Sequence, residues 1–161
     1  MIWGVDSKMR EVAMFCGESH RAVVIQSNRP SRGEQLEEMR ALVIEATAID
    51  PDPILVIEES VVAGARNIRS TIKCAETVGM LLSLPYPTYL VEIGKWKKNT
   101  VGNGNAKKSD VADWLREAHP VYSSLCGGNQ DLVDAASIYV YGEQVVDAYK
   151  RGTSVGGPTD L

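Results

Sequence analysis

The first part of the chain alternates short apolar runs with turn residues. Residues 2–6 (IWGVD), 11–15 (EVAMF) and 21–26 (RAVVIQ) are apolar and partly β-branched, and Gly17 lies between the second run and the third. Runs of this length bounded by turn residues are typical of strands. The pattern therefore predicts an antiparallel meander of three strands, the first of which ends in a carboxylate, Asp6.

From Ser31 onward the apolar positions recur with the spacing of a helix. Ser31 and Glu34 have the form of a capping box at its start, and the helix is expected to end before Pro51. Residues 54–58 (ILVIE) then form a continuous apolar run. This run predicts a buried strand that also ends in a carboxylate, Glu58.

The rest of the chain predicts four more elements. Helical spacing over 61–84 places one group of apolar residues on a shared face: Ala63, Ile68, Ile72, Ala75 and Val78. A strand is expected over 88–93, followed by a polar, glycine-rich loop over 99–106. Two further helices are expected over 109–118 and 129–149.

The order of these elements, βββαβαβαα, predicts an α/β fold with a mixed sheet of about five strands, antiparallel at first and parallel afterwards. The apolar runs at 54–57 and 88–91 have no polar face, so helices are expected to cover both faces of the sheet. The length suits one domain, expected over residues 1–150. Residues 151–161 are rich in Gly, Ser and Pro and are expected to be disordered.

Four carboxylates are placed where they could meet. If the first and fourth strands are neighbours, Asp6 and Glu58 lie close at their ends, and the start of the last helix can bring Asp131 and Asp134 opposite them. The last two are three residues apart, so they share one helix face. Crowded carboxylates need compensating charge, and hard oxygen ligands prefer Mg²⁺ or Mn²⁺. Two such ions suit the hydrolysis of a phosphodiester.

Simpler structural roles remain open for the same residues. An Asp after a strand is often a turn or cap residue, and either Glu58 or Glu59 could be the relevant acid at the end of its strand. Asp131 and Asp134 could simply favour the helix dipole. Their apolar neighbours argue against that last interpretation, because plain dipole partners usually lie among polar residues.

The distribution of charge along the chain weakens the conclusion drawn from the net charge alone. The net charge of −4 and the pI of about 5.2 argue against a nucleic-acid partner. However, the stretch 95–108 holds five lysines and no acid, and 61–75 holds three basic residues and no acid. The candidate DNA contacts are Arg66, Arg69, Lys73, Lys98, Lys107 and Lys108. Trp96, among the lysines, could stack on a base or pack at a strand end.

Other features exclude several classes of protein. The three cysteines show no CxxC spacing, so neither a disulfide framework nor a zinc site is expected. No signal peptide is apparent, and the longest apolar stretch is interrupted by prolines and too short to cross a bilayer. The two histidines, His20 and His119, are expected at the surface or in loops. A soluble, cytoplasmic protein without a membrane partner is expected.

Four motifs occur in order: GVD at 4–6, VIEES at 56–60, VGNGNAKKSDVADWL at 101–115 and QDLVDAASIYV at 130–140. Their order and spacing resemble those of the RuvC family of Holliday junction resolvases, within the RNase H-like superfamily, over roughly residues 1–148. The third motif is the most specific, because a glycine-rich loop leading into this helix start is not a general α/β feature.

The resemblance implies an RNase H-like fold and metal-dependent cleavage of four-way DNA junctions. It implies that Asp6, Glu58, Asp131 and Asp134 bind Mg²⁺ or Mn²⁺, with two ions per site, and that Lys108 is the family's functional lysine near the DNA phosphate. A homodimer is implied as well, since symmetric incision of a junction needs two sites. The expected setting is the cytoplasm of a bacterium, for a protein encoded by the bacterium or by a phage.

The sequence also departs from the family. The resemblance favours Glu58 over Glu59, because the family's acid directly follows an apolar β-branched residue at the strand end. Beyond Glu59, Val61 or Val62 stands where bacterial members have an aromatic residue that helps to open the junction. The hairpin region at 11–30 is also short. These departures put in doubt the strong sequence preference of the family.

Three other functions stay open at this point. The first is a related nuclease acting on flaps, replication forks or RNA–DNA hybrids. The second is a catalytically inactive junction-binding protein, which the presence of all four carboxylates disfavours. The third, an α/β enzyme acting on a small molecule, is disfavoured because GNGN at 102–105 lacks the GxGxxG form of a nucleotide-binding turn.

Overall fold

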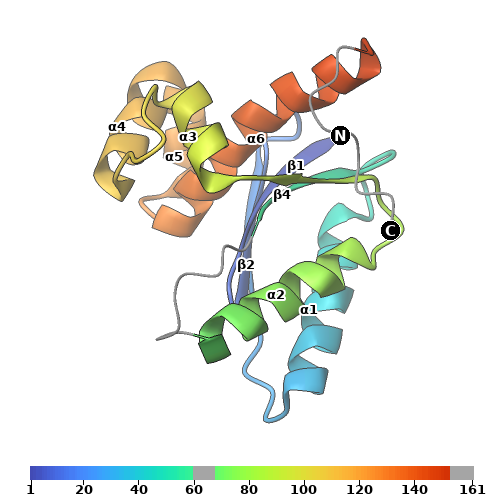
Figure 1. The fold of residues 1–161 in the computed structure, drawn as a ribbon. Coiled ribbons are helices and arrows are strands. Elements are labelled where there is room, and N and C mark those ends of the chain that lie inside the picture. The colour runs from blue at the N-terminus through green and yellow to red at the C-terminus, as the bar shows by residue number, and fades with distance from the viewer. Residues whose placement is uncertain (60–67, 153–161) are drawn as a thin grey trace.

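The structure is a computed structural model, and it describes residues 1–59 and 68–152. The five strands are β1 (Ile2–Ser7), β2 (Glu11–Cys16), β3 (Arg21–Gln26), β4 (Ile54–Glu58) and β5 (Thr88–Val91). The helices are α1 (Arg32–Thr47), α2 (Ile68–Leu82), α3 (Ile93–Thr100), α4 (Lys108–Ala118), α5 (Pro120–Cys126) and α6 (Gln130–Lys150) (Figure 1).

The strands form one mixed sheet in the order β3-β2-β1-β4-β5. β1 pairs antiparallel with β2, and β2 with β3, whereas β4 runs parallel to both β1 and β5. The predicted α/β fold with an antiparallel and then a parallel part is confirmed. So is the capping box of α1, in which the Ser31 side chain accepts from the Glu34 N–H and the Glu34 side chain accepts from the Ser31 N–H.

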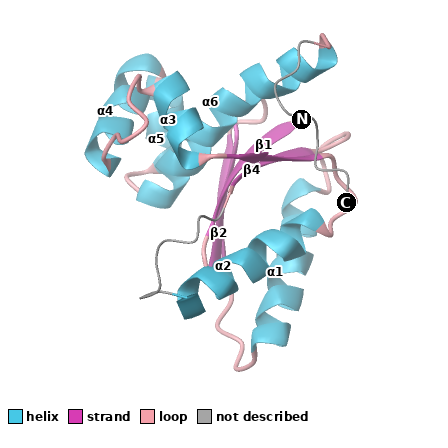
Figure 2. Cartoon of the chain, in the orientation of Figure 1, coloured by secondary structure: helices cyan, strands magenta, loops and turns pink. Residues whose placement is uncertain are grey.

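Helices cover both faces of the sheet, as expected (Figure 2). Alternate residues of each strand point to opposite faces, and two separate clusters of buried side chains result. One cluster, which includes Trp3, Val5 and Leu55, packs against α1 and α2. The other includes Phe15 and Val56 and packs against the group formed by α3 to α6.

Helix α6 lies very close to the middle of the sheet, because the strand and the helix each have a glycine where they meet. A Cβ atom added to Gly4 of β1 would lie 2.2 Å from the Ala135 carbonyl oxygen and 2.3 Å from the Tyr139 nitrogen, both in the α6 backbone. Farther along the helix, a Cβ atom on Gly142 would lie 2.8 Å from a methyl group of Val56. The helix therefore rests directly on the β1–β4 seam.

Two short helices were not predicted. The strand expected over 88–93 ends at Val91, and α3 follows at once, so the expected loop begins only after Thr100. Only Trp96 of α3 and Cys126 of α5 are buried. A helix anchored by a single buried side chain has no apolar periodicity to detect. The Pro at the first position of α5 was its one available signal.

The apolar residues predicted to share one face of α2 are not the residues through which the helix packs on the sheet. Val78 is buried, but Ile68 and Ile72 are each 51% exposed and Ala75 is exposed, while Ala63 lies outside the described residues. The buried residues of α2 are Thr77, Val78, Met80 and Leu81. The helix thus packs on the sheet through its second half, and its first half extends past the core. Within the described ranges, the helices are too short or too polar to span a bilayer.

The close approach of α6 predicts the effect of adding one methyl group at Gly4. We expect Gly4→Ala to destabilise the protein by about 3 kcal/mol, because the methyl group meets backbone atoms that cannot turn aside. Thermal or urea unfolding measures this change. Gly33→Ala is the matched control: an added Cβ there meets nothing within 4 Å, and in α1 it should be neutral or stabilising by about 0.5–1 kcal/mol. Equal stability of both variants would contradict the prediction.

Candidate metal centre

Two carboxylates lie side by side at the ends of neighbouring strands. Val5 of β1 pairs with Ile57 of β4, so the next residues, Asp6 and Glu58, lie at the same edge of the sheet. Both point to the face that α6 covers, as Ile2 and Val56 do in the same strands. Asp6 is only 9% exposed and Glu58 is half-buried.

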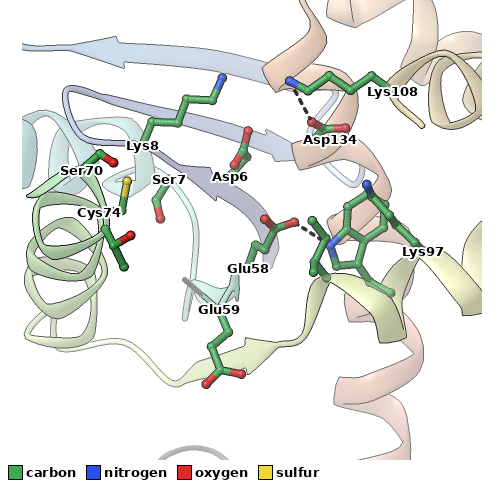
Figure 3. A pocket seen from close by; sticks show the side chains of 13 residues that line it. Asp6, Ser7, Lys8, Glu58, Glu59, Ser70, Cys74, Lys97, Lys108 and Asp134 are labelled. Carbon is green, nitrogen blue, oxygen red and sulfur yellow. Dashed lines mark hydrogen bonds and ion pairs between the residues drawn. The ribbon is translucent and has the colours of Figure 1, made fainter. Parts of the chain in front are cut away.

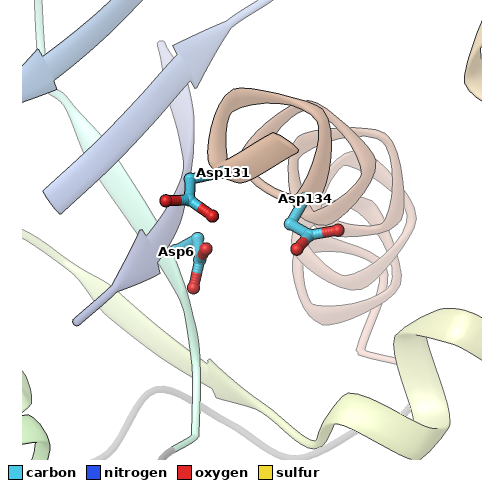
Figure 4. Close-up of side chains that lie close together, drawn as sticks. All are labelled: Asp6, Asp131 and Asp134. Carbon is cyan, nitrogen blue, oxygen red and sulfur yellow. The ribbon is translucent and has the colours of Figure 1, made fainter. Parts of the chain in front are cut away.

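The first turns of α6 bring two more carboxylates to this edge. The Asn129 side chain caps the helix and accepts hydrogen bonds from the N–H groups of Asp131 (2.9 Å) and Leu132 (3.1 Å). This cap starts the helix just before Asp131, and Asp134 follows on the same face. One oxygen from each of Asp6, Asp131 and Asp134 lies within 4.8 Å of the others (Figure 4). These three residues are called the carboxylate cluster below.

Glu58 lies across the same cavity and is held by a tryptophan. Its Oε2 accepts a hydrogen bond of 2.7 Å from Nε1 of Trp96, which is fully buried (Figure 3). Trp96 therefore packs at the strand end, and stacking on a base, the alternative considered for it, is excluded. Glu59 also lines the cavity but is exposed and points away from Asp6 in Figure 3. The geometry favours Glu58 as the fourth carboxylate.

The cavity that these residues share has a volume of about 410 Å³. Its lining combines the carboxylates of Asp6, Glu58 and Asp134 with the ammonium groups of Lys8, Lys97 and Lys108. The wall opposite α6 comes from α2, through Ser70, Thr71 and Cys74. Acidic and basic groups thus converge on one solvent-accessible space, as a site for a cation and a phosphate would require.

Lysines from three elements approach the cluster. Lys8, in the β1–β2 turn, forms an ion pair with Asp131. Nζ of Lys108, at the start of α4, lies 3.8 Å from Asp131 Oδ1 and 3.9 Å from Asp134 Oδ2. Lys97 donates to the Ala106 carbonyl oxygen at 3.0 Å. Lys8 was missed in the sequence, where its position two residues after Asp6 was the sole signal.

The other predicted DNA-contacting residues lie around the cavity rather than in it. Lys98 and Lys107 are exposed at the end of α3 and before α4, and Arg69 is exposed at the start of α2. Lys73 is half-buried in α2. Arg66, Val61 and Val62 lie outside the described residues. The histidines His20 and His119 line a different cavity of about 300 Å³, where His119 stacks on Tyr122.

Burial and mutual repulsion govern the electrostatics of the carboxylates. Burial, with the charges of Glu58 and Asp134 nearby, raises the pKa of Asp6 to about 7. Burial likewise raises the pKa of Glu58, although the hydrogen bond from Trp96 opposes it, and raises that of Asp134 against the charge of Lys108. Ionising all of them at neutral pH is therefore unfavourable without a further positive charge.

Asp131 differs from the other members of the cluster. Burial acts to raise its pKa, but the hydrogen bond from Lys8 and the charges of Lys8 and Lys108 hold the pKa below its ordinary value. The charge of Asp131 is thus matched within the protein, whereas at Asp6 and Asp134 burial and nearby negative charge outweigh the lysines. Clustered carboxylate oxygens with uncompensated charge can hold a divalent cation, and such hard ligands select Mg²⁺ or Mn²⁺ over zinc.

The fold is similar to that of solved RuvC structures. RuvC of Thermus thermophilus in complex with a Holliday junction substrate matches with a TM-score of 0.67 and 19% sequence identity, over 98% of each chain. A second T. thermophilus RuvC structure matches with a TM-score of 0.62 and 17% identity, also over 98% of each chain. No protein-family model matches the sequence, and no curated protein matches it either.

The raised pKa of Asp6 predicts how the stability of the cation-free protein depends on pH. Between its ordinary value of 3.8 and about 7, Asp6 holds a proton in the folded protein but not in the unfolded one. Its contribution to stability is therefore full below about pH 4 and is lost as the pH rises to about 7. With EDTA at pH 8, Asp6→Asn should raise the free energy of unfolding by on the order of 2–4 kcal/mol.

Urea unfolding of both proteins at pH 4 and pH 8 measures the difference. At pH 4 Asp6 is neutral in the folded protein and about half ionised in the unfolded one, so the variant and the original protein should be nearly equal in stability. If Asp6→Asn is less stable than the original protein at pH 8, burial of the charged Asp6 carboxylate does not destabilise the folded protein and the prediction is wrong.

Proposed function

We propose that this protein is a divalent-cation-dependent endonuclease that resolves four-way DNA junctions and related branched DNA. The observation that carries the proposal is the meeting of Asp6, Asp131 and Asp134 within 4.8 Å, with Glu58 across the same cavity. The likeness to RuvC, one structure of which was solved with a Holliday junction substrate, supports it. The nuclease domain spans residues 1–150, and it acts in the cytoplasm of a bacterium, on bacterial or phage DNA.

The proposed cofactor is a pair of Mg²⁺ or Mn²⁺ ions held by Asp6, Glu58, Asp131 and Asp134. The fit rests on three features of the site: only oxygen ligands, an unmatched negative charge, and access from solvent. When bound, two such ions would activate the attacking water and stabilise the leaving 3′ oxygen of the phosphodiester. The buried indole of Trp96 keeps one Glu58 oxygen oriented towards this space.

Lys108 is suited to contact the phosphate that is cut. Its side chain is 61% exposed, and its ammonium group stands nearly 4 Å from two carboxylates, so neither holds it in a close hydrogen bond. The four-carbon stem lets it turn towards a phosphate at the cavity mouth. There it would stabilise the negative charge that develops on the phosphate oxygens.

The flanking DNA would follow the basic residues around the cavity. Lys98, Lys107 and Arg69 are exposed on α3, before α4 and on α2, and Lys73 and Arg66 extend the same stretch of sequence. Phosphate contacts of this kind supply affinity without sequence preference. A local basic surface is compatible with the acidic total, since the carboxylates of the site contribute to that total.

A homodimer is proposed, because paired incision of a four-way junction needs two sites. Helix α2 offers a contact surface: residues at i, i+4, i+7 and i+11 form an exposed stripe of Ile68, Ile72, Ala75 and Gly79. A Cβ atom on Gly79 would meet nothing within 4 Å. Small and apolar residues at this spacing let two helices pack closely, so a second copy is proposed to pack on this stripe.

A second candidate function rests on the sequence after Glu59. Val61 or Val62 replaces the aromatic residue that helps bacterial resolvases to open a junction. This replacement favours a broader range of substrates, such as flaps, replication forks or RNA–DNA hybrids, cut at the same metal centre. A catalytically inactive junction-binding protein is disfavoured, because it has no need of four converging carboxylates.

The first test is cleavage of a labelled four-way junction with Mg²⁺ or Mn²⁺. We expect paired, symmetric nicks, and a loss of about a hundredfold or more in rate for Asp6→Asn, which removes a cation ligand. Glu58→Gln should be similarly impaired, whereas the matched variant Glu59→Gln should retain activity, because Glu59 points away from the cluster. Gel analysis of both strands measures site and symmetry.

The substrate panel separates the alternatives. If the protein cuts flaps, forks or hybrids but leaves four-way junctions intact, the proposed metal centre stands and the proposed substrate is wrong. Tight junction binding without cleavage, unaffected by EDTA or by Asp6→Asn, would contradict the endonuclease proposal.

If two copies pack through the α2 stripe, a charge placed on the stripe should weaken the dimer. Ile72→Glu should weaken association by about a hundredfold or more, because each copy would bury an unpaired carboxylate in the contact. Analytical ultracentrifugation measures the shift to monomer, and circular dichroism checks the fold. Ile49→Glu is the control, since Ile49 is 76% exposed and lies after α1, away from the stripe. A dimer that persists in Ile72→Glu places the contact elsewhere.

A further inference from the structure

Lys8 is a further charged residue of the candidate metal centre, beside the four carboxylates and Lys108. It lies in the turn between β1 and β2, directly after the strand that carries Asp6, and its ammonium group pairs with Asp131. Asp6 and Glu11 add to the negative charge around it. Lys8 therefore contacts one oxygen of a carboxylate that a cation would use, although its side chain is still 44% exposed.

The backbone of this turn is fixed from several sides. The Lys8 N–H donates to the Glu11 carbonyl oxygen at 2.8 Å, and the Ser27 N–H donates to the Arg10 carbonyl oxygen at 3.1 Å. Arg32 donates to the carbonyl oxygen of the next residue, Met9. The position of Lys8 beside the cluster is thus set by the fold, while its flexible stem leaves the ammonium group free to move.

Arg32 ties the same turn to α2. Its guanidinium group donates to Thr77 Oγ1 at 2.9 Å and forms an ion pair with Glu76 at 2.7 Å, while it also reaches Met9. This contact holds the turn between the cluster on one side and α2 on the other. Lys8 is therefore carried on a rigid support rather than on a loop that could swing away from Asp131.

Two positive charges cannot share one carboxylate oxygen at contact distance. A divalent cation held by Asp6, Asp131 and Asp134 together needs the Asp131 carboxylate, and Lys8 already contacts one oxygen of that carboxylate. At separations of a few ångströms the repulsion between the ammonium group and the cation is large, since water only partly screens it in a half-buried cavity. Either the ammonium group leaves Asp131 or the cation binds with fewer ligands.

We propose that Lys8 is a built-in competitor for the divalent cation at Asp131 and that it thereby sets the cation concentration at which the centre fills. The proposal rests on the cation-binding part of the proposed function but not on the choice of DNA substrate. In the cation-free protein Lys8 neutralises Asp131 and keeps the cluster together. When the cation binds, the ammonium group moves off the carboxylate into the cavity.

Titration calorimetry of the DNA-free, full-length protein with MnCl₂ at pH 7.5 tests this proposal. We expect Lys8→Met, which keeps the length of the side chain and removes its charge, to lower the Kd for Mn²⁺ about tenfold, a change of about 1.4 kcal/mol. Lys8→Arg keeps the charge and should bind Mn²⁺ nearly as the original protein does. Lys150→Met is the matched control, because Lys150 lies about 28 Å along α6 from Asp131, beyond the range of unscreened repulsion.

Thermal unfolding gives a second readout that needs no catalysis. Without cation, Lys8→Met should unfold at a lower temperature than the original protein, because Asp131 loses its partner. With saturating Mn²⁺ the difference should vanish or reverse, so the gain in Tm on adding Mn²⁺ should be larger for Lys8→Met. Circular dichroism of the variant in EDTA confirms that the comparison is between folded proteins.

Each outcome decides the proposal. An unchanged or weaker Mn²⁺ affinity in Lys8→Met overturns it, and a weaker one would show that Lys8 orders the ligands. If neither protein binds Mn²⁺, the inference and the metal-dependent function fail together. Lys8-dependent Mn²⁺ binding without junction cleavage would leave the inference standing and reject the nuclease. Junction cleavage with Lys8-independent affinity would reject the inference alone.

Discussion

The contact between the backbone of α6 and the β1–β4 seam is the constraint on which the rest of the site depends. It exists because Gly4 has no side chain beneath Ala135 and Tyr139, and because Gly142 meets Val56 with none of its own. A helix held at this depth brings its first turns level with the ends of both strands. One oxygen each of Asp131 and Asp134 then lies within 4.8 Å of an oxygen of Asp6. Backbone packing, rather than any property of the carboxylates, assembles the cluster.

The cost of that assembly is electrostatic. Like charges are forced together in a half-buried cavity, so Asp6 has a pKa of about 7 and Asp134 also takes up a proton more readily than usual. Lysines from the β1–β2 turn and from α4 offset part of the repulsion at Asp131 and Asp134. What remains is excess negative charge on clustered carboxylate oxygens, which are the ligands that a hard cation prefers. The same carboxylates that would hold a cation therefore destabilise the folded protein when no cation is bound.

The sequence was informative where one local rule decides the outcome. Short apolar runs bounded by turn residues located the strands, and the Ser31–Glu34 pair located the start of α1. The strand-end positions of Asp6 and Glu58 predicted that they would meet. Features that depend on tertiary contact could not be predicted. The hydrogen bond from Trp96 to Glu58, and the ion pair of Lys8 with Asp131, join residues far apart in the chain. The exposed stripe on α2 has the periodicity of a core helix, and periodicity alone does not say which surface covers it.

The arrangement of the cluster along the chain has a consequence for biosynthesis. Asp6 and Glu58 belong to strands in the first part of the sequence, whereas Asp131 and Asp134 open the last helix that the structure describes. A ribosome releases these segments in order, and the early strands can pair before α6 exists. The nascent chain therefore carries an incomplete set of carboxylates through most of its synthesis. The four carboxylates come together only once α6 docks on the seam, so completion of the fold and completion of the candidate site are one event.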